Sequence, residues 1–214
     1  MQSRVQDVMT TDLATVPEGA GFKEIVATMR QRRVSAFPVL DPDGHVIGVV
    51  SEADLLMKEV GPDSARSLIA TGRRGQRAKA AGATAAELMN SPAVVTSPEC
   101  SVADAAKLMR GHRVKRLPVV DGAGRLVGIV SRIDLLSVYE RPDGEIRDEV
   151  LRYAARRASA IDADSLAVTV TSGIVTVSGR AASRAAAYEL VEAVRRAEGV
   201  VDVRDRISYP PPPG

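Results

Sequence analysis

The sequence predicts an α+β protein in which one helix–strand–strand–helix unit occurs twice and is followed by a smaller α+β domain. The stretch from Val8 to Leu56 recurs from Leu88 to Leu136 at an offset of 80 residues, which marks a duplicated unit. After residue 142 the pattern changes to a helix, a hairpin, a helix and a last strand. The predicted boundaries are 1–60 for the first copy, 61–84 for a basic linker, 85–140 for the second copy, 143–209 for the C-terminal domain and 210–214 for a proline-rich tail.

The two copies share residues along their whole length. Aligned identities include Met9 with Met89, Met29 with Met109, Arg33 with Arg113, Val34 with Val114, Pro38 with Pro118, Asp41 with Asp121, Gly48 with Gly128, Ser51 with Ser131 and Asp54 with Asp134. One motif, Thr-x-Pro-Glu, matches instead at an offset of 81, from Thr15 and from Thr96. We therefore expect a one-residue insertion and a compensating deletion, both in loops.

Each copy predicts the same local structure. Apolar residues spaced i, i+3, i+4 and i+7 run from Phe22 to Met29 and from Val102 to Met109, which indicates an amphipathic helix. The runs VSAFPVLD and VKRLPVVD predict a first strand, and a turn signal follows each. The runs HVIGVVS and RLVGIVS predict a second strand, after which a closing helix begins.

Composition limits the classes of function. Apolar residues make up 45% and charged residues 26%, as in folded globular chains, whereas aromatic residues make up only 3%, which leaves few platforms for stacking nucleic-acid bases. Cys100 is the only cysteine, so an intramolecular disulfide or a cysteine metal cluster is excluded. No apolar leader or spanning segment is recognised, so we expect a soluble, cytoplasmic protein.

The net charge of +2 is unevenly distributed. The segment from Gly61 to Ala86 holds five basic residues against Asp63, a net charge of +4. Such a cluster can contact nucleic acid or the phosphates of a ligand, but a run of charge is more often solvated. We therefore do not expect nucleic acid among the partners.

The order D-V-M, T-x-P, V-S-A-x-P-V-x-D and G-x-x-S-x-x-D-L, present twice between Gln6 and Val138, resembles the CBS repeat. Tandem pairs of this repeat form a Bateman module. The resemblance implies two repeats related by a pseudo-twofold axis and a ligand bound between them. It also implies a regulatory protein and not an enzyme.

The G-x-x-S-x-x-D motif has two interpretations. A strand that ends at serine, followed by a helix with aspartate three residues after the serine, brings a hydroxyl, a carboxylate and the free N–H groups of the helix N-terminus close together. The carboxylate can accept hydrogen bonds from both ribose hydroxyls, while the serine and the helix N-terminus suit a phosphate. Gly48 and Gly128 allow a close backbone approach. The alternative is a capping box, in which the serine and the aspartate only cap the helix.

The two copies differ around this motif. Ser51 is followed by Glu52, whose charge opposes a phosphate, and Ser131 is followed by Arg132. In CBS pairs, basic residues at the positions of Lys115 and Arg116 often reach phosphates of the neighbouring site. The resemblance thus favours a site that uses Asp54 for the ribose and Lys115, Arg116 and Arg132 for phosphates, unless Lys115 and Arg116 are only a solvated edge.

The full set of candidate ligand contacts also includes apolar segments that can sandwich a purine. It comprises Thr15, Val16, Pro17, Val34, Ser35, Ala36, Phe37, Pro38, Ser51, Asp54, Thr96, Val114, Lys115, Arg116, Leu117, Pro118, Ser131, Arg132 and Asp134. The expected ligand is an adenosine nucleotide, AMP, ADP or ATP, with S-adenosylmethionine as a further candidate. No cofactor, metal site or catalytic set is expected, because His45 and His112 are the only histidines and Cys100 has no evident base.

The C-terminal region follows its own pattern. After a turn at Pro142–Gly144, Ile146, Val150 and Tyr153 predict a helix, and runs at 166–170 and 174–178 predict a hairpin. A second helix then buries Ala187, Val191 and Val194, Gly199 stands at its C-terminal cap, and Val201, Val203 and Ile207 alternate along a strand.

The order V-T-V-x-x-G-I-V-T-V-S-G, a helix and E-G-V-V-D-V-R-D-R-I resembles the BON domain. That resemblance implies a membrane or envelope partner. From Gly144 to Tyr209, however, ten arginines balance ten acidic residues, so attraction to anionic lipid is weak and a protein partner is at least as plausible.

Two hypotheses follow. The first is a nucleotide sensor in which the BON-like domain reads out a change in the packing of the repeats. The alternative is a ligand-free scaffold that dimerises and uses the BON-like domain for interaction. Both include a homodimer, because Ala- and Leu-rich helix faces remain for a second copy to cover.

Overall fold

The computed structural model describes residues 3–57, 83–157 and 159–211 of the 214 residues. The chain divides into two compact units, one of residues 4–132 and one that starts at Ile133 and includes the first three residues. Each unit is described by itself. Most of the predicted linker at 61–84 and of the tail at 210–214 lies outside the described residues.

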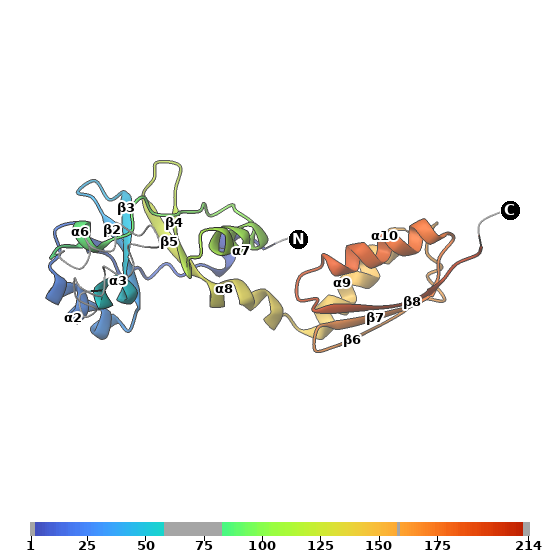
Figure 1. Ribbon diagram of the computed structural model, residues 1–214. Helices are drawn as coiled ribbons and strands as arrows, with labels where there is room; N and C mark the ends of the chain where they lie inside the picture. Colours follow the sequence, from blue (N-terminus) through green and yellow to red (C-terminus); the bar gives the residue numbers. More distant parts are fainter. Residues whose placement is uncertain (1–2, 58–82, 158, 212–214) are drawn as a thin grey trace, which may run out of the picture. The chain divides into compact units, whose positions relative to one another are not determined.

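The first unit contains the two copies of the predicted arrangement, except that the closing helix of the second copy extends past Arg132, where this unit ends (Figure 1). The first copy comprises α1 (Val5–Val8), β1 (Val16–Pro17), α2 (Phe22–Arg32), β2 (Ala36–Leu40), β3 (Val46–Ser51) and α3 (Glu52–Leu56). The second copy comprises α6 (Ala85–Leu88), α7 (Val102–Gly111), β4 (Arg116–Val120) and β5 (Leu126–Ser131), with α8 (Arg132–Leu136) and a 3₁₀ helix (Ser137–Glu140) after them. The α+β class and the helix–strand–strand–helix order are confirmed.

The strand registers of the two copies are the same. β2 and β3 pair antiparallel, as do β4 and β5, and both hairpins shift register at the same place, between Val39 and Leu40 and between Val119 and Val120. β1 adds a short parallel strand to β2. The first-copy core includes Ile25, which α2 supplies, and Phe37, which β2 supplies, both fully buried.

The expected insertion and deletion around the Thr-x-Pro-Glu motif are wrong. Val16 lies opposite Val39 in a parallel pair, and Thr96 lies opposite Val119 in the same kind of pair. The offset therefore stays at 80, and Thr96 occupies the place of Val16 and not that of Thr15. The motif matches at 81 only in its letters, because the backbone register is set by strand pairing.

The two copies exchange their N-terminal segments across a pseudo-twofold axis. Val5 N–H donates to the carbonyl of Cys100 at 2.8 Å, and Ala85 N–H donates to the carbonyl of Ala20 at 2.9 Å. Adding 80 to the residue number of the donor and subtracting 80 from that of the acceptor converts the first hydrogen bond into the second. Two bridges obey the same rule: Thr10 with Ile129, and Asn90 with Val49.

The motif glycines serve this exchange. A Cβ at Gly48 would lie 2.3 Å from Sδ of Met89, and a Cβ at Gly128 would lie 2.4 Å from Sδ of Met9. The absence of a side chain at these positions leaves room for the methionine of the other copy against the strand. The close approach that these glycines allow is therefore to a methionine of the protein.

The second unit holds α9 (Asp143–Ala155), β6 (Ala167–Thr171), β7 (Ile174–Arg180), α10 (Arg184–Arg195) and β8 (Asp202–Ser208). The sheet order is β6-β7-β8, with β6 antiparallel and β8 parallel to β7. Figure 1 shows α9 and α10 on one face of this sheet. Both helices bury apolar residues against it, among them Ile146, Val150, Ala187, Leu190, Val191 and Val194.

Three details of the second unit differ from expectation. Asp143 and Gly144 begin α9 instead of forming a turn, because Asp143 is held by the hairpin described below. Gly199, with φ +85, lies beyond the end of α10, which Arg196 caps. Val201 precedes β8 and is 62% exposed, so the core side of the strand begins at Val203.

Candidate functional site

The Ser-x-x-Asp motif of the first copy is a closed hydrogen-bonded cluster. Asp54 is only 7% exposed although it carries a carboxylate. Its Oδ2 accepts from the backbone N–H of Ser51 at 2.9 Å and from the hydroxyl of Ser51 at 2.6 Å. Its Oδ1 accepts from the side-chain amide of Asn90, in the second copy, at 2.9 Å.

This geometry gives Asp54 a structural role within the protein. Its carboxylate oxygens accept hydrogen bonds from both Ser51 and Asn90. The aspartate caps α3 from its first turn and also ties the two copies together. A ribose that bound here would compete with these bonds.

The corresponding position of the second copy is built differently. Arg132 stands where the first copy has Glu52, and its guanidinium donates to the carbonyl of Val114 at 3.0 and 3.2 Å. Arg132 thereby fastens the end of β5 to the segment before β4. Ser131 is partly buried, and Asp134 lies in α8, beyond the division between the two units.

A pocket of about 470 Å³ opens at the start of β2. Arg116, the first residue of β4, donates from Nη2 to Oγ of Ser35 at 2.6 Å and so links the second copy to the first. The pocket is lined by Met29, Arg30, Arg33, Val34, Ser35, Glu52 and Arg116. Three arginines against one glutamate make it a positively charged site, in which a guanidinium and a hydroxyl are already oriented by each other.

Only some of the predicted contacts come together there. Val34, Ser35 and Arg116 line the pocket, and Lys115 is exposed next to it in sequence. Thr15, Pro17, Ser51 and Val114 are not among the lining residues. Most of the remaining predicted contacts are buried in strands or at strand edges: Val16, Ala36, Phe37, Pro38, Leu117 and Pro118.

Three residues at the site were missed from the sequence. Arg30 and Arg33 line the pocket from the end of α2, and the identity of Arg33 with Arg113 was a signal that could have drawn attention to them. Asn90 was missed because it meets Asp54 only through the exchange of segments between copies. No local pattern in the sequence reports such a contact.

Thr96 lines a second pocket, of about 450 Å³, formed with residues 95–99 and 120–122. The residue is 6% exposed, and its Oγ1 is buried without a hydrogen-bond partner among the described residues. Because Thr96 occupies the place of Val16, its hydroxyl lies where the first copy has a methyl group. The hydroxyl itself is therefore inaccessible to a molecule in that pocket.

Within the described ranges, one group has metal-ligand atoms close together: Asp41, Asp43 and His45, within 4.8 Å of one another. Oδ1 of Asp41 accepts from the backbone N–H groups of Asp43 at 3.0 Å and His45 at 2.8 Å, and Oδ2 lies 3.2 Å from Nδ1 of His45. These contacts, above all the backbone bond from His45, lower the pKa of Asp41. These contacts are the ones that an aspartate makes at the start of a turn, so the three residues are explained by the turn between β2 and β3.

These features define a duplicated module with a charged pocket where its copies meet, and comparison with known proteins identifies its family. CBS-domain models match residues 5–61 and 85–141, and a BON-domain model matches residues 142–211. The chain belongs to the CBS-domain family and carries a C-terminal BON domain.

Among known proteins, the chain is 35% identical to the CBS domain-containing protein YhcV of Bacillus subtilis, over 62% of this chain and 83% of that protein. It is 30% identical to a Methanocaldococcus jannaschii protein, of which it spans 31%. It is also 27% identical to inosine-5'-monophosphate dehydrogenase of Mycobacterium tuberculosis over 66% of this chain, but it spans only 23% of that enzyme. That match therefore does not extend to a whole enzyme.

Among solved structures, CBSX2 in complex with AMP is 29% identical, with a TM-score of 0.55, over 63% of this chain and 94% of that one. CBSX2 from Arabidopsis thaliana is also matched by a second structure, with 28% identity, a TM-score of 0.50 and coverage of 64% of this chain and 94% of that one. In the ranges that the structure describes, no helix is both long and apolar enough to cross a membrane.

Proposed function

We propose that this protein is a cytoplasmic adenosine-nucleotide sensor whose CBS pair binds the ligand and whose BON domain passes on the change. The observation that carries the proposal is the contact between Arg116 of one repeat and Ser35 of the other at the wall of a positively charged pocket. A phosphate in this pocket takes the guanidinium and the hydroxyl as donors. The AMP complex of CBSX2, a similar protein, supports an adenosine nucleotide as the ligand.

The Arg116–Ser35 contact also gives the sensor a mechanism. The bond joins the two repeats, so a phosphate that recruits Arg116 changes the link between them. A ligand shifts a conformational equilibrium only through unequal affinity for the two arrangements. Arg116 provides that inequality if the arrangement of the repeats that holds it against Ser35 binds a phosphate more tightly than an arrangement in which the two are apart.

In this proposal Asp54 positions the site more than it binds the ligand. Its bonds to Ser51 and Asn90 fix the end of β3 relative to the segment of the second repeat. Ser51, Lys115 and Arg132 remain candidate contacts for phosphate, and Asp54 and Asp134 remain candidate contacts for ribose. The alternative role of the module, a ligand-free scaffold, needs none of these contacts.

We also propose that the chain is a homodimer through its CBS module. Leu56 of α3 is 60% exposed, and Ile133 and Leu136 of α8 are 72% and 54% exposed. Apolar side chains at this exposure suit burial against a second copy. Light scattering should give twice the mass of the 22.6 kDa chain.

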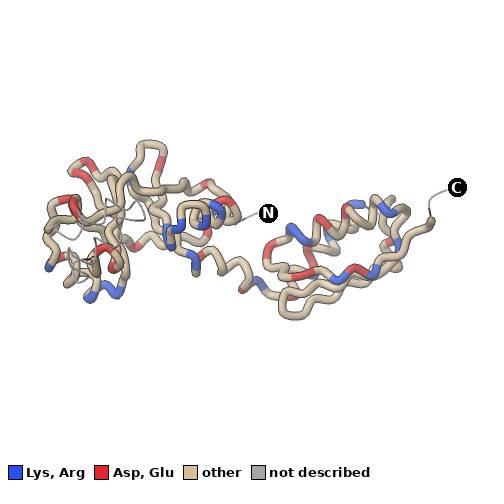
Figure 2. The backbone as a smooth tube through the Cα atoms, viewed as in Figure 1, with Lys and Arg blue, Asp and Glu red and all other residues tan. Residues whose placement is uncertain are grey.

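For the BON domain we propose a protein or membrane partner. Figure 2 shows basic and acidic positions interspersed over its helices and over β8, as expected from equal numbers of the two. Tyr188, 66% exposed on α10, is an apolar contact that such a partner can cover.

A thermal-stability screen of the full chain against AMP, ADP, ATP, GTP and S-adenosylmethionine tests the sensor directly. A ligand present at a hundred times its dissociation constant adds about 2.7 kcal/mol to the free energy of unfolding, which raises the melting temperature measurably. We expect stabilisation by at least one adenosine nucleotide. Absence of any shift at millimolar concentration would favour the ligand-free scaffold.

A further inference from the structure

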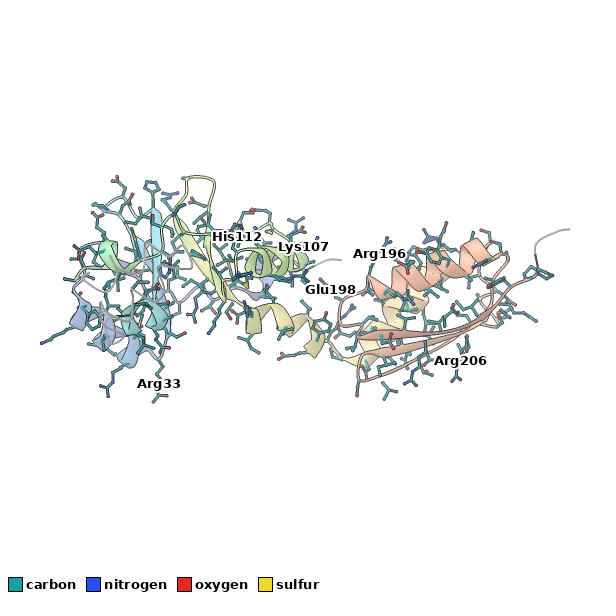
Figure 3. The ribbon with its side chains drawn as sticks, in the orientation of Figure 1. Arg33, Lys107, His112, Arg196, Glu198 and Arg206 are labelled. Carbon is teal, nitrogen blue, oxygen red and sulfur yellow. The ribbon has the colours of Figure 1, made fainter. Side chains whose placement is uncertain are left out.

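The pocket has two arginines that its structural contacts do not explain. Arg116 is partly buried and bonded to Ser35, but Arg30 and Arg33 are exposed. Over the part of the chain that the structure describes, neither Arg30 nor Arg33 makes a hydrogen bond or an ion pair through its side chain. Figure 3 shows Arg33 extending away from the ribbon at the end of α2, and Figure 2 shows basic positions gathered there.

Arg33 stands at a backbone position that favours glycine. It ends α2 with φ 53 and ψ 40, in the left-handed region where helices usually end with glycine or asparagine. Arg113, two residues beyond the end of α7, also has a left-handed backbone, with φ 57. The left-handed backbone is therefore common to both repeats, and glycine can replace either arginine without strain.

Helix ends give one explanation for these arginines. Basic residues in a last turn interact favourably with the helix dipole, which applies to Arg30 and also to Arg110 of α7. The helix dipole, however, acts equally in both repeats. Of the arginines at the ends of α2 and α7, Arg30 and Arg33 alone line the described pocket that contains Arg116. A comparison of the two repeats therefore separates an effect of the helix dipole from an effect of ligand binding.

We propose that Arg30 and Arg33 form an outer phosphate subsite, so that the pocket binds nucleoside triphosphates more tightly than monophosphates. The inference rests on the proposed function, with Arg116 and Ser35 as the inner contacts. A triphosphate carries about two more negative charges than a monophosphate, and guanidinium groups bind phosphate oxygens in pairs. Glu52, the acidic lining residue, opposes the same charges.

Calorimetric titration of the full chain with AMP and ATP tests the subsite through the variants Arg33→Gly and Arg113→Gly. Glycine favours the left-handed backbone, so both variants keep the helix end intact. The parent should bind ATP at least about tenfold more tightly than AMP, as expected for added charge-assisted contacts. Arg33→Gly should lose about fivefold or more in ATP affinity and under about twofold in AMP affinity, while Arg113→Gly changes neither.

Further variants sharpen the result. Arg33→Lys should retain part of the preference, because the charge remains but the paired donors of the guanidinium are lost, and Glu52→Gln should strengthen ATP binding more than AMP binding. Equal affinities of the parent for AMP and ATP would overturn the outer subsite and leave the nucleotide pocket standing. Equal losses in Arg33→Gly and Arg113→Gly would overturn it as well. Binding of neither nucleotide to the parent would remove both the subsite and the proposed function.

Discussion

At the scale of single residues, duplication lets each repeat serve as the control for the other. Val16 and Thr96 occupy the same place in their repeats, and both are nearly fully buried. The side chain of Val16 needs no hydrogen bond in this buried position, whereas the hydroxyl of Thr96 has no hydrogen-bond partner among the described residues. The second repeat therefore retains a cost that the first has avoided.

Thr96→Val should stabilise the protein. The substitution replaces an unpaired buried hydroxyl by a methyl group of similar size, and a buried unsatisfied group costs about 1–3 kcal/mol. We expect a gain of about 1 kcal/mol in the free energy of unfolding, measured by urea denaturation. A loss of similar size would mean that the hydroxyl has a partner in solution, and Val16→Thr should show the opposite change.

Asp54→Ala separates the capping interpretation from the ribose interpretation. The buried carboxylate accepts hydrogen bonds from Ser51 and Asn90, and bonds to charged groups contribute about 1.5–3 kcal/mol each, so the variant should be destabilised by about 3 kcal/mol. If Asp54 also binds ribose, affinity for an adenosine nucleotide should fall at least about tenfold in the folded variant.

Asp134→Ala is the matched control for that experiment, and calorimetry on folded protein is the measurement. Loss of affinity in Asp54→Ala alone would place the ribose at the first repeat. If both variants bound the nucleotide as tightly as the parent, Ser-x-x-Asp would be a helix cap at both positions.

At the scale of elements, the second unit shows how a helix start can fix a hairpin. The carboxylate of Asp143 accepts from the N–H groups of Ser172 and Gly173 at 2.7 and 2.8 Å. Both turn residues have positive φ, 51 and 73, which exposes their N–H groups toward one side. The negative charge also lies in the first turn of α9, where the helix dipole favours it.

Asp143→Ala should therefore loosen the β6–β7 turn and the start of α9 together. Two hydrogen bonds to a charged, partly buried group are lost, and we expect destabilisation of the BON domain by about 1–2 kcal/mol. Hydrogen exchange at Ser172 and Gly173 should accelerate, while exchange in β4 and β5 should not change. Unchanged exchange at the turn would contradict the role of Asp143.

Local patterns predicted most of these elements, because apolar periodicity and turn residues report burial along one segment. They failed where the structure depends on distant segments. The Thr-x-Pro-Glu alignment was wrong because strand pairing, and not sequence likeness, sets the register of Thr96. The start of α9 was read as a turn because the partners of Asp143 lie 29 and 30 residues away.

At the scale of the whole molecule, the duplication and the two family patterns were sufficient to predict two CBS repeats and a BON domain. The pocket was predictable only in part. Arg116 was expected from the family pattern, whereas Arg30 and Arg33 reach the pocket through the end of α2, at positions that periodicity assigns simply to solvent.

Truncation tests whether the two domains fold separately. The core of the first repeat includes residues from Val16 to Leu88, and the BON core includes residues from Ile146 to Val203, with no residue in common. A chain ending at Arg141 should therefore keep a cooperative thermal transition, followed by circular dichroism. Loss of cooperative melting would show that the two domains depend on a shared core.

Calorimetric titration of the parent chain and Arg116→Ala with ATP tests the central claim, that a nucleotide binds where Arg116 meets Ser35, most directly. The proposal predicts binding to the parent and a loss of at least about tenfold in the folded variant, because a charge-assisted contact contributes about 1.5–3 kcal/mol. Equal affinities of the two proteins, or no binding to the parent at millimolar ATP, would contradict it.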